Sequence, residues 1–253
     1  MVRGPRSGWN GGTLNEREHM KPTIVLVHGA FAESASWNEV IAQLQAEGYP
    51  VIAAPNPLRS VSGDAAVVSA LLATIDGPVV LAGHSYGGQV ISNAAVGHDN
   101  VKALVFVAAF APEAGESIGF LSGKFPGSTL GETLREVPLA DGSVDLFIRP
   151  EKFHQQFIGD VSAEVAALAA ATQRPLNTTA LNEGSGEPAW KNVPSWFIYP
   201  ELDLNIPLAA HRFMAERAGA RTTVELPGAS HAIPASEPAA VAETILRAAR
   251  SVA

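Results

Sequence analysis

The chain has 253 residues, 47% of them hydrophobic and 17% charged, which is typical of one globular domain or of one domain with an insertion. Its net charge of −8 argues against a nucleic-acid partner, because binding phosphates requires clustered lysine and arginine. The absence of cysteine excludes disulfides, thiolate metal ligands and a cysteine nucleophile.

The sequence pattern also gives no indication of a membrane-spanning segment or a signal peptide. No apolar run reaches the length of a membrane span, and the first residues lack the apolar centre of a signal peptide. We therefore expect a cytoplasmic protein without a membrane partner, either a monomer or a homodimer. Residues 1–20 are glycine-rich at their start and aperiodic, which predicts a purification tag or a disordered extension.

From Thr23 onward, short apolar segments alternate with segments of helical periodicity. Near-continuous apolar strands separated by amphipathic helices predict a mostly parallel sheet that is covered on both faces, an α/β fold of about six strands. The predicted strands are residues 23–27, 51–54, 78–82, 101–108, 194–199 and 222–226.

Residues 112–190 interrupt this alternation. The segment is rich in glycine, proline and charge, yet its five phenylalanines exclude a merely disordered linker. We predict an inserted, mostly helical cap over the carboxyl edge of the sheet, between core segments 21–111 and 191–253. Its aromatic residues are candidates for substrate binding: Phe120, Phe125, Phe147, Phe153 and Phe157.

The most informative motif is Gly83-His84-Ser85-Tyr86-Gly87, which fits G-x-S-x-G. A buried strand precedes it and a helical stretch follows it, so Ser85 is predicted to lie on a tight strand-to-helix turn with its hydroxyl exposed above the sheet. That context favours a catalytic nucleophile over the alternative, a glycine-rich turn with a solvated serine.

A serine nucleophile needs a base to accept its proton and an acid to orient that base. In open α/β sheets such groups gather at the carboxyl ends of the strands. Asp203 follows strand 194–199 and His231 follows strand 222–226, and the chain order serine, aspartate, histidine is the one expected for this architecture.

Other residues compete for these roles. Glu113 is an alternative acid after strand 101–108, and Glu201 is closer to its strand than Asp203 but is expected to be solvated. His28 is expected to brace its loop through a hydrogen bond, and His84 to point away from the nucleophile. The remaining histidines in helical or cap segments are expected at the surface or in a pocket wall: His98, His154 and His211.

Acyl transfer also requires two donors for the developing oxyanion. One is the backbone N–H of Tyr86, directly after the nucleophile. The other is expected from the loop after the first strand, with Ala30 as first choice and Phe31 as second. Phe31 is in addition a candidate for substrate binding.

These motifs resemble the α/β-hydrolase superfamily from about Thr23 to Ala253. Within it, Val27-His28-Gly29-Ala30 followed by Trp37 looks like the compact branch of plant methyl esterases, hydroxynitrile lyases and bacterial pyrethroid-type carboxylesterases. The resemblance implies a Ser85–Asp203–His231 triad under a mobile cap. Ala232 stands where hydroxynitrile lyases place a lysine, which disfavours lyase activity.

The function expected from these residues is cofactor-independent hydrolysis of a carboxylic ester with a small, largely apolar structure, and it requires no metal. The alternatives on the same triad are a C–C, lactone or amide hydrolase or a perhydrolase. A ligand-binding receptor of the same fold is the alternative from a different functional class.

Overall fold

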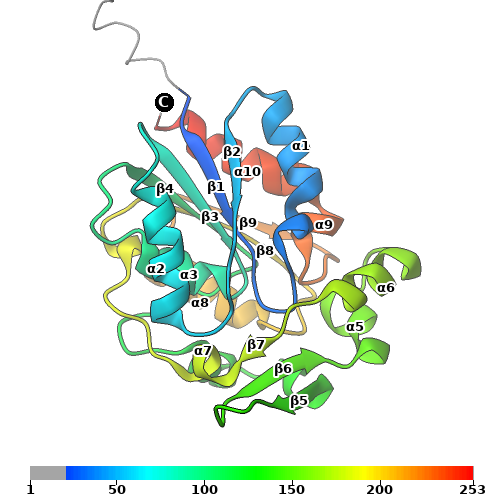
Figure 1. Ribbon diagram of the computed structural model, residues 1–253. Coiled ribbons are helices and arrows are strands. Elements are labelled where there is room, and N and C mark those ends of the chain that lie inside the picture. Colours follow the sequence, from blue (N-terminus) through cyan, green and yellow to red (C-terminus); the bar gives the residue numbers. More distant parts are fainter. Residues whose placement is uncertain (1–20, 253) are drawn as a thin grey trace, which may run out of the picture.

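The computed structural model describes residues 21–252, and six parallel strands form its central sheet (Figure 1). This confirms the predicted fold class, and each predicted strand is present with its bounds shifted by at most two residues. In spatial order the strands are β2 (Val51–Ala54), β1 (Thr23–Val27), β3 (Val79–His84), β4 (Val101–Val107), β8 (Ser195–Pro200) and β9 (Thr222–Leu226).

The alternating side chains of the strands supply two cores, one on each face of the sheet. Val25 and Val27 point to one face, and Ile24 and Leu26 to the other, with all four fully buried. Burial of each such side chain stabilises the fold by about 1.5–3 kcal/mol. The first face packs on α2 (Val61–Leu72), α3 (Gly87–Ala94) and α8 (Leu208–Arg217), and the second on α1 (Asn38–Ala46) and α10 (Pro238–Arg250).

The strand order places the loop after β1 beside the turn after β3. The chain runs from β1 outward to β2 and then returns to β3 on the other side of β1, so the direction of winding reverses between β1 and β3. Loops that leave the carboxyl ends of strands at such a reversal diverge and open a crevice. Because β1 and β3 are adjacent parallel strands, the loop after β1 and the turn after β3 lie at the two sides of this crevice.

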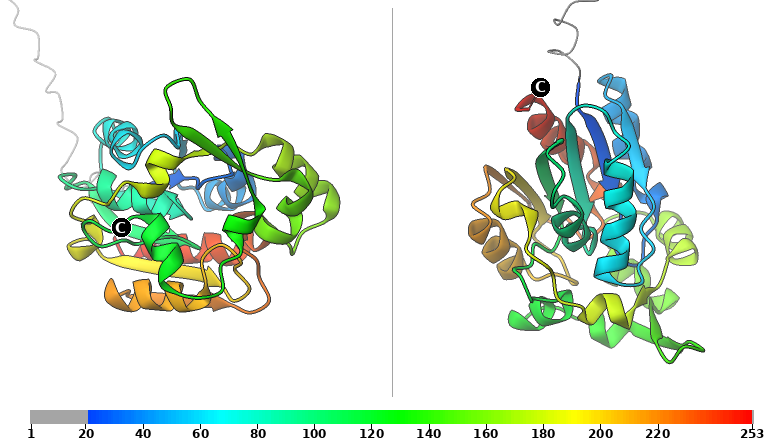
Figure 2. Two further views of the ribbon diagram at one scale, coloured as in Figure 1. Left: turned by 90° about the horizontal axis from the view of Figure 1, so that it is seen from below. Right: turned by 60° about the vertical axis from the view of Figure 1, so that its left-hand side comes forward.

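The predicted cap lies across the carboxyl edge of the sheet (Figure 2, left). Helices predominate in it, but it also contains a three-stranded antiparallel sheet that the sequence analysis missed. The turn Asp141-Gly142, with Gly142 at φ 85°, marked the hairpin of this sheet. The cap elements are α4 (Ile118–Lys124), β5 (Leu134–Pro138), β6 (Val144–Ile148), α5 (Pro150–Phe157), α6 (Ala163–Thr172), β7 (Leu176–Asn177) and α7 (Thr178–Asn182).

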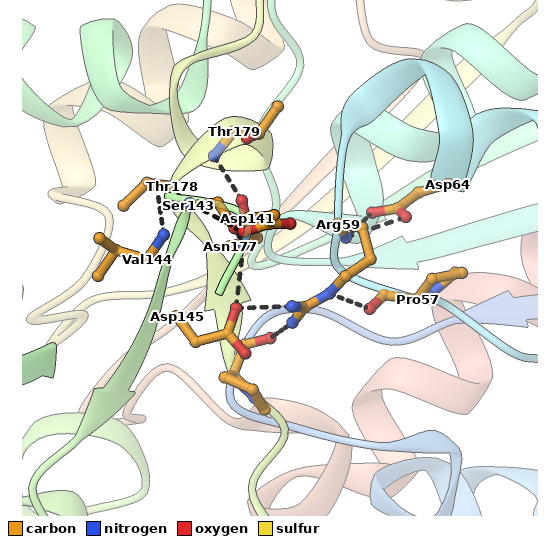
Figure 3. A network of polar contacts seen from close by, with 11 residues as sticks. Pro57, Arg59, Asp64, Asp141, Ser143, Val144, Asp145, Asn177, Thr178 and Thr179 are labelled. Carbon is orange, nitrogen blue, oxygen red and sulfur yellow. Dashed lines mark hydrogen bonds and ion pairs between the residues drawn. The ribbon is translucent and has the colours of Figure 1, made fainter. Parts of the chain in front are cut away.

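Arg59, just before α2, joins the cap to the core (Figure 3). Its guanidinium donates to Asp145 Oδ1 of β6 at 2.6 Å and to the carbonyl of Pro175 at 3.0 Å, while its backbone N–H donates to Asp64 of α2. Asn177 of β7 also donates to Asp145, at 3.1 Å. Arg59, two residues before α2, thus links β6 and the residue that precedes β7 to a core helix.

The predicted extension, residues 1–20, lies outside the described residues, as does Ala253. Among residues 21–252, none of the helices combines the length and the apolar character that crossing a bilayer requires.

Replacing Arg59 by glutamine should loosen the cap sheet without unfolding the core. The Arg59 side chain is 41% exposed, so solvent screening limits the expected loss to about 1 kcal/mol, which is about fivefold in local opening. Hydrogen exchange of peptides covering residues 134–148 measures it. Arg212→Gln, which breaks a surface pair with Glu225, is the matched control. Equal exchange in both variants would contradict the assigned role of Arg59.

Candidate active site

Ser85 occupies a strained turn between β3 and α3. Its φ of 54° is in the left-handed region, which costs a residue with a side chain about 1–3 kcal/mol. The turn is fixed by backbone bonds: Ser85 N–H donates to Val107, and its carbonyl accepts from Gly88 at 3.0 Å and from Phe110 at 3.1 Å. The geometry is that of the strand–turn–helix predicted from the motif.

Glycine at two positions lets the loop after β1 lie directly against this turn. A Cβ at Gly29 would be 2.6 Å from Ser85 Cβ, and a Cβ at Gly87 would be 2.5 Å from the carbonyl oxygen of Val27. Real Cβ atoms essentially never lie this close to another heavy atom. Any residue other than glycine at position 29 or 87 would therefore force the backbone to shift. The motif glycines are therefore required here for close approach, and neither has a positive φ.

Asp203, in the loop after β8, accepts four hydrogen bonds. His231 Nδ1 lies 2.7 Å and His211 Nε2 3.0 Å from its Oδ2. The backbone N–H groups of Asn205 and Ile206 donate to its Oδ1 at 2.8 and 2.9 Å. The carboxylate is completely shielded from solvent. Asp203 and His231, predicted from separate strand ends, are thus in direct contact.

The bonds to Asp203 determine its charge and the tautomer of His231. Burial alone would raise the pKa of Asp203, but the charge and hydrogen bonds of His231 and His211 outweigh burial and hold this pKa well below its ordinary value. An ionised carboxylate only accepts, so His231 Nδ1 carries the proton that it shares with Asp203. Nε2 is then the nitrogen free to accept a proton. Ser85 and His231 line one pocket.

His211 corrects an expectation, because it is neither at the surface nor in a pocket wall. It is fully buried, bonded to Asp203 and stacked on Tyr199, with ring centres 5.1 Å apart. Burial lowers its pKa, so it is neutral and donates from Nε2. The spacing of His211 with Met214 and Ala215, which are also buried, was the signal that this residue lies on the inner face of α8.

Two further buried histidines support the catalytic loops. His84 Nε2 lies 3.1 Å from the carbonyl oxygen of His231, and the two rings are 4.9 Å apart. The side chain of His84 therefore supports the histidine loop. His28 Nδ1 lies 2.9 Å from the carbonyl oxygen of Gly29, the bracing bond expected from the sequence. Burial lowers the pKa of His28 to about 4 and that of His84 to about 3.

The structure distinguishes between the two candidates for the second oxyanion donor. Phe31 N–H already donates to the carbonyl of Arg174 in the cap, at 3.0 Å. Within residues 21–252, the N–H groups of Ala30 and Tyr86 donate to no protein acceptor. The hydroxyl of Tyr86 donates to the buried Asp64 at 2.8 Å, which fixes the residue that follows Ser85. Ala30 is therefore favoured over Phe31.

The other acidic and histidine candidates are bonded elsewhere. Among the described residues, no group of three or more histidine, aspartate and glutamate side chains is arranged to hold a metal ion. Glu113 pairs with Lys191 at the surface, at 2.5 Å, and Glu201 is exposed and accepts from Gly228 N–H. Of the histidines, His98 forms a hydrogen bond with Ser69, and His154 forms one with the carbonyl of Val161.

The pocket above Ser85 has a volume of about 40 Å³. Phe31 and Phe157 line it, whereas Phe153 lines a neighbouring cavity. The other three cap phenylalanines line neither space. Phe120 is 55% exposed, Phe125 packs on Phe213, and Phe147 lies under Arg135.

Comparison with known proteins gives a family match and several similar relatives. The family model described as "Alpha/beta hydrolase family" matches residues 24–244. The chain is 31% identical over 244 residues to the pyrethroid hydrolase of Sphingobium wenxiniae, an alignment that covers 88% of this chain and 85% of that protein. It is 25% identical over 247 residues to salicylic acid-binding protein 2 of Nicotiana tabacum, which covers 88% and 95% of the two chains.

A solved structure confirms the fold. Polyneuridine aldehyde esterase superposes with a TM-score of 0.79 at 20% sequence identity, covering 90% of this chain and 98% of that one. The family match over residues 24–244 and the relative at 31% identity confirm the family resemblance inferred from the motifs.

The neutral buried histidines predict a pH dependence of stability. Because the pKa of His28 is lowered to about 4 in the folded state, the unfolded chain binds the proton more readily below its own pKa of about 6.5. The contribution of neutral His28 to the free energy of unfolding is thus fully present above about pH 6.5. It falls by about 1.4 kcal/mol per pH unit as the pH drops toward 4.

His28→Asn keeps a donor for Gly29 and removes the titrating ring. Its free energy of unfolding, from urea titrations at pH 6.5, 6.0 and 5.5, should fall less steeply with acidification than that of the wild type. Identical slopes would show that His28 is not buried in its neutral form.

Proposed function

Because this chain belongs to the α/β-hydrolase family, we propose that it hydrolyses carboxylic esters through an acyl-enzyme on Ser85. The observation that carries the proposal is the 2.7 Å contact between His231 Nδ1 and the buried Asp203, beside the strained turn that presents Ser85. Relatives named pyrethroid hydrolase and methylesterase support an ester as the bond that is cleaved.

In the first half of the reaction, the Ser85 hydroxyl attacks the acyl carbon and passes its proton to His231 Nε2. The resulting imidazolium is stabilised by Asp203, which is already ionised and already bonded to Nδ1. His231 then returns the proton to the departing alkoxide. The acyl group remains bonded to Ser85.

The tetrahedral intermediate carries a negative charge on the former carbonyl oxygen. The unpaired N–H groups of Ala30 and Tyr86 are assigned to this oxygen, and removal of one such donor costs about 2.7–4 kcal/mol of barrier in comparable sites. Since Gly29 lets the two loops touch, the two donors come from loops in direct contact.

In the second half, water takes the place of the alcohol. His231 Nε2 removes a proton from the water as it attacks the acyl carbon, and returns that proton to Ser85 when the acid leaves. Every step uses groups of this chain alone. The pocket lining of Ile118, Leu130 and Leu146 favours an apolar substituent on the substrate.

An organophosphonate should label Ser85 and no other serine. Ser85→Ala should abolish labelling and lower ester turnover on the order of 10⁴-fold or more, because only binding and the oxyanion donors remain. Peptide mass spectrometry locates the label. Ser230 and Ser36 are the internal controls, and a label on either would refute the assignment.

Asp203→Asn should lower kcat about 10⁴-fold, since the amide favours the wrong imidazole tautomer. Glu113→Gln, which breaks only the surface pair with Lys191, should change kcat less than twofold in accordance with the small contribution of exposed pairs. Steady-state kinetics on one ester compares them. The reverse order of effects would place the catalytic acid after β4.

A further inference from the structure

The pocket above Ser85 is narrow, with a volume of about 40 Å³. A long substituent of a substrate needs space beyond this pocket. The space next to it therefore bears on which substrates Ser85 can accept.

A second cavity of about 500 Å³ lies on the other side of one such wall. It is open to solvent on one side and is bordered by the cap helices α5 and α6, by the 3₁₀-helix η1 (Ser34–Trp37) and by α9 (Ile233–Ser236). We call it the outer cavity. Its lining is mostly aliphatic or aromatic, and it includes Phe153, Ile158, Leu168, Ala169 and Pro234.

Phe31 and Phe157 line both spaces and form the wall between them. Their rings meet edge to face, with centres 6.3 Å apart, and the Phe157 ring also lies 5.1 Å from that of His231. The backbone of Phe157 is fixed, since its carbonyl accepts from Ala232 N–H at 3.1 Å. The Phe157 ring also packs on Phe153 and His84, with ring centres 5.0 and 6.2 Å away, so any opening of this wall has to displace the Phe157 ring from these neighbours.

The charges around the outer cavity restrict its ligand. The charged side chains of its lining are Glu33 and Glu39, both acidic. They disfavour a carboxylate or phosphate, because like charges repel and nothing in the lining neutralises them. On α6, Val165 and Leu168 are 47% and 70% exposed, an unusual exposure for large apolar residues that a bound apolar group would cover.

We propose that the outer cavity is a substrate subsite, which binds the longer apolar arm of an uncharged ester once the Phe157 ring has moved aside. The proposal rests on the proposed function of Ser85 and adds the substrate class: neutral esters with one extended hydrophobic arm. Because Phe31 and Phe157 are the shared wall between the outer cavity and the pocket of Ser85, the occupant is assigned as part of the molecule that Ser85 attacks.

Filling the outer cavity tests the proposal. Ala169→Trp places an indole in the lining, and Ala167→Trp places the same indole on the exposed side of α6 as the matched control. The readout is the ratio of kcat/KM for a long ester to that for an aryl acetate, measured with decanoyl and with decyl esters because either arm can be the longer one.

Ala169→Trp should lower this ratio about tenfold or more for at least one of the two long esters, since apolar subsite contacts are worth about 1–3 kcal/mol. Ala167→Trp should leave both ratios within twofold of the wild type. Unchanged ratios in Ala169→Trp would overturn the subsite.

A binding measurement separates the subsite from the chemistry. Ser85→Ala protein should bind the preferred long ester more tightly than decanoate, and adding Ala169→Trp should remove that preference. If wild-type protein cleaves no ester but this binding pattern is found, the proposed reaction fails and the cavity assignment stands. Equal binding of ester and carboxylate, or binding unaffected by Ala169→Trp, would refute the assignment.

Discussion

The carboxylate of Asp203 is the group on which the geometry of the site depends. A fully buried charge is costly unless all of its acceptor positions are used, and here two backbone N–H groups and two histidines use them. The backbone donors fix Oδ1 to the loop after β8, which leaves Oδ2 facing His231. Because His211 shares Oδ2, the carboxylate cannot turn away when His231 moves.

The loops after β1 and β9 are connected to the cap by backbone hydrogen bonds. Phe31 N–H donates to Arg174 in the cap, and Ala232 N–H donates to the carbonyl of Phe157 in α5. Arg59 adds a third link, to Asp145. The cap is therefore anchored beside the loop that carries Ala30 and the loop that carries His231. If the outer cavity is a subsite, as we propose, side chains such as that of Phe157 would accommodate substrate size while this backbone stays in place.

Much of the fold could be predicted from the sequence because a parallel sheet imposes strong constraints. Buried strands are apolar throughout, and polar residues just after them meet at one edge. Together with the motif around Ser85 and the chain order, this position was enough to propose Ser85, Asp203 and His231. The hairpin of the cap escaped detection because β5 is largely exposed, although β6 alternates with Val144, Leu146 and Ile148 on one buried face, a signal that was missed. The contact of His211 with Asp203 was not predicted, because Asp203 lies in the loop after β8 and His211 on α8. Only the packing of α8 brings the two side chains together.

The tautomer of His231 is the most direct test of the central claim, which is that Asp203 prepares this ring to accept a proton from Ser85. Nitrogen-15 NMR of protein labelled at histidine, with His211→Gln used to assign its neighbour, distinguishes the two ring nitrogens. The account predicts, at neutral pH, a proton on Nδ1 in a strong bond to Asp203 and a bare Nε2. A proton on Nε2 with a bare Nδ1 would contradict it, since that ring could neither bond to the carboxylate nor act as the base.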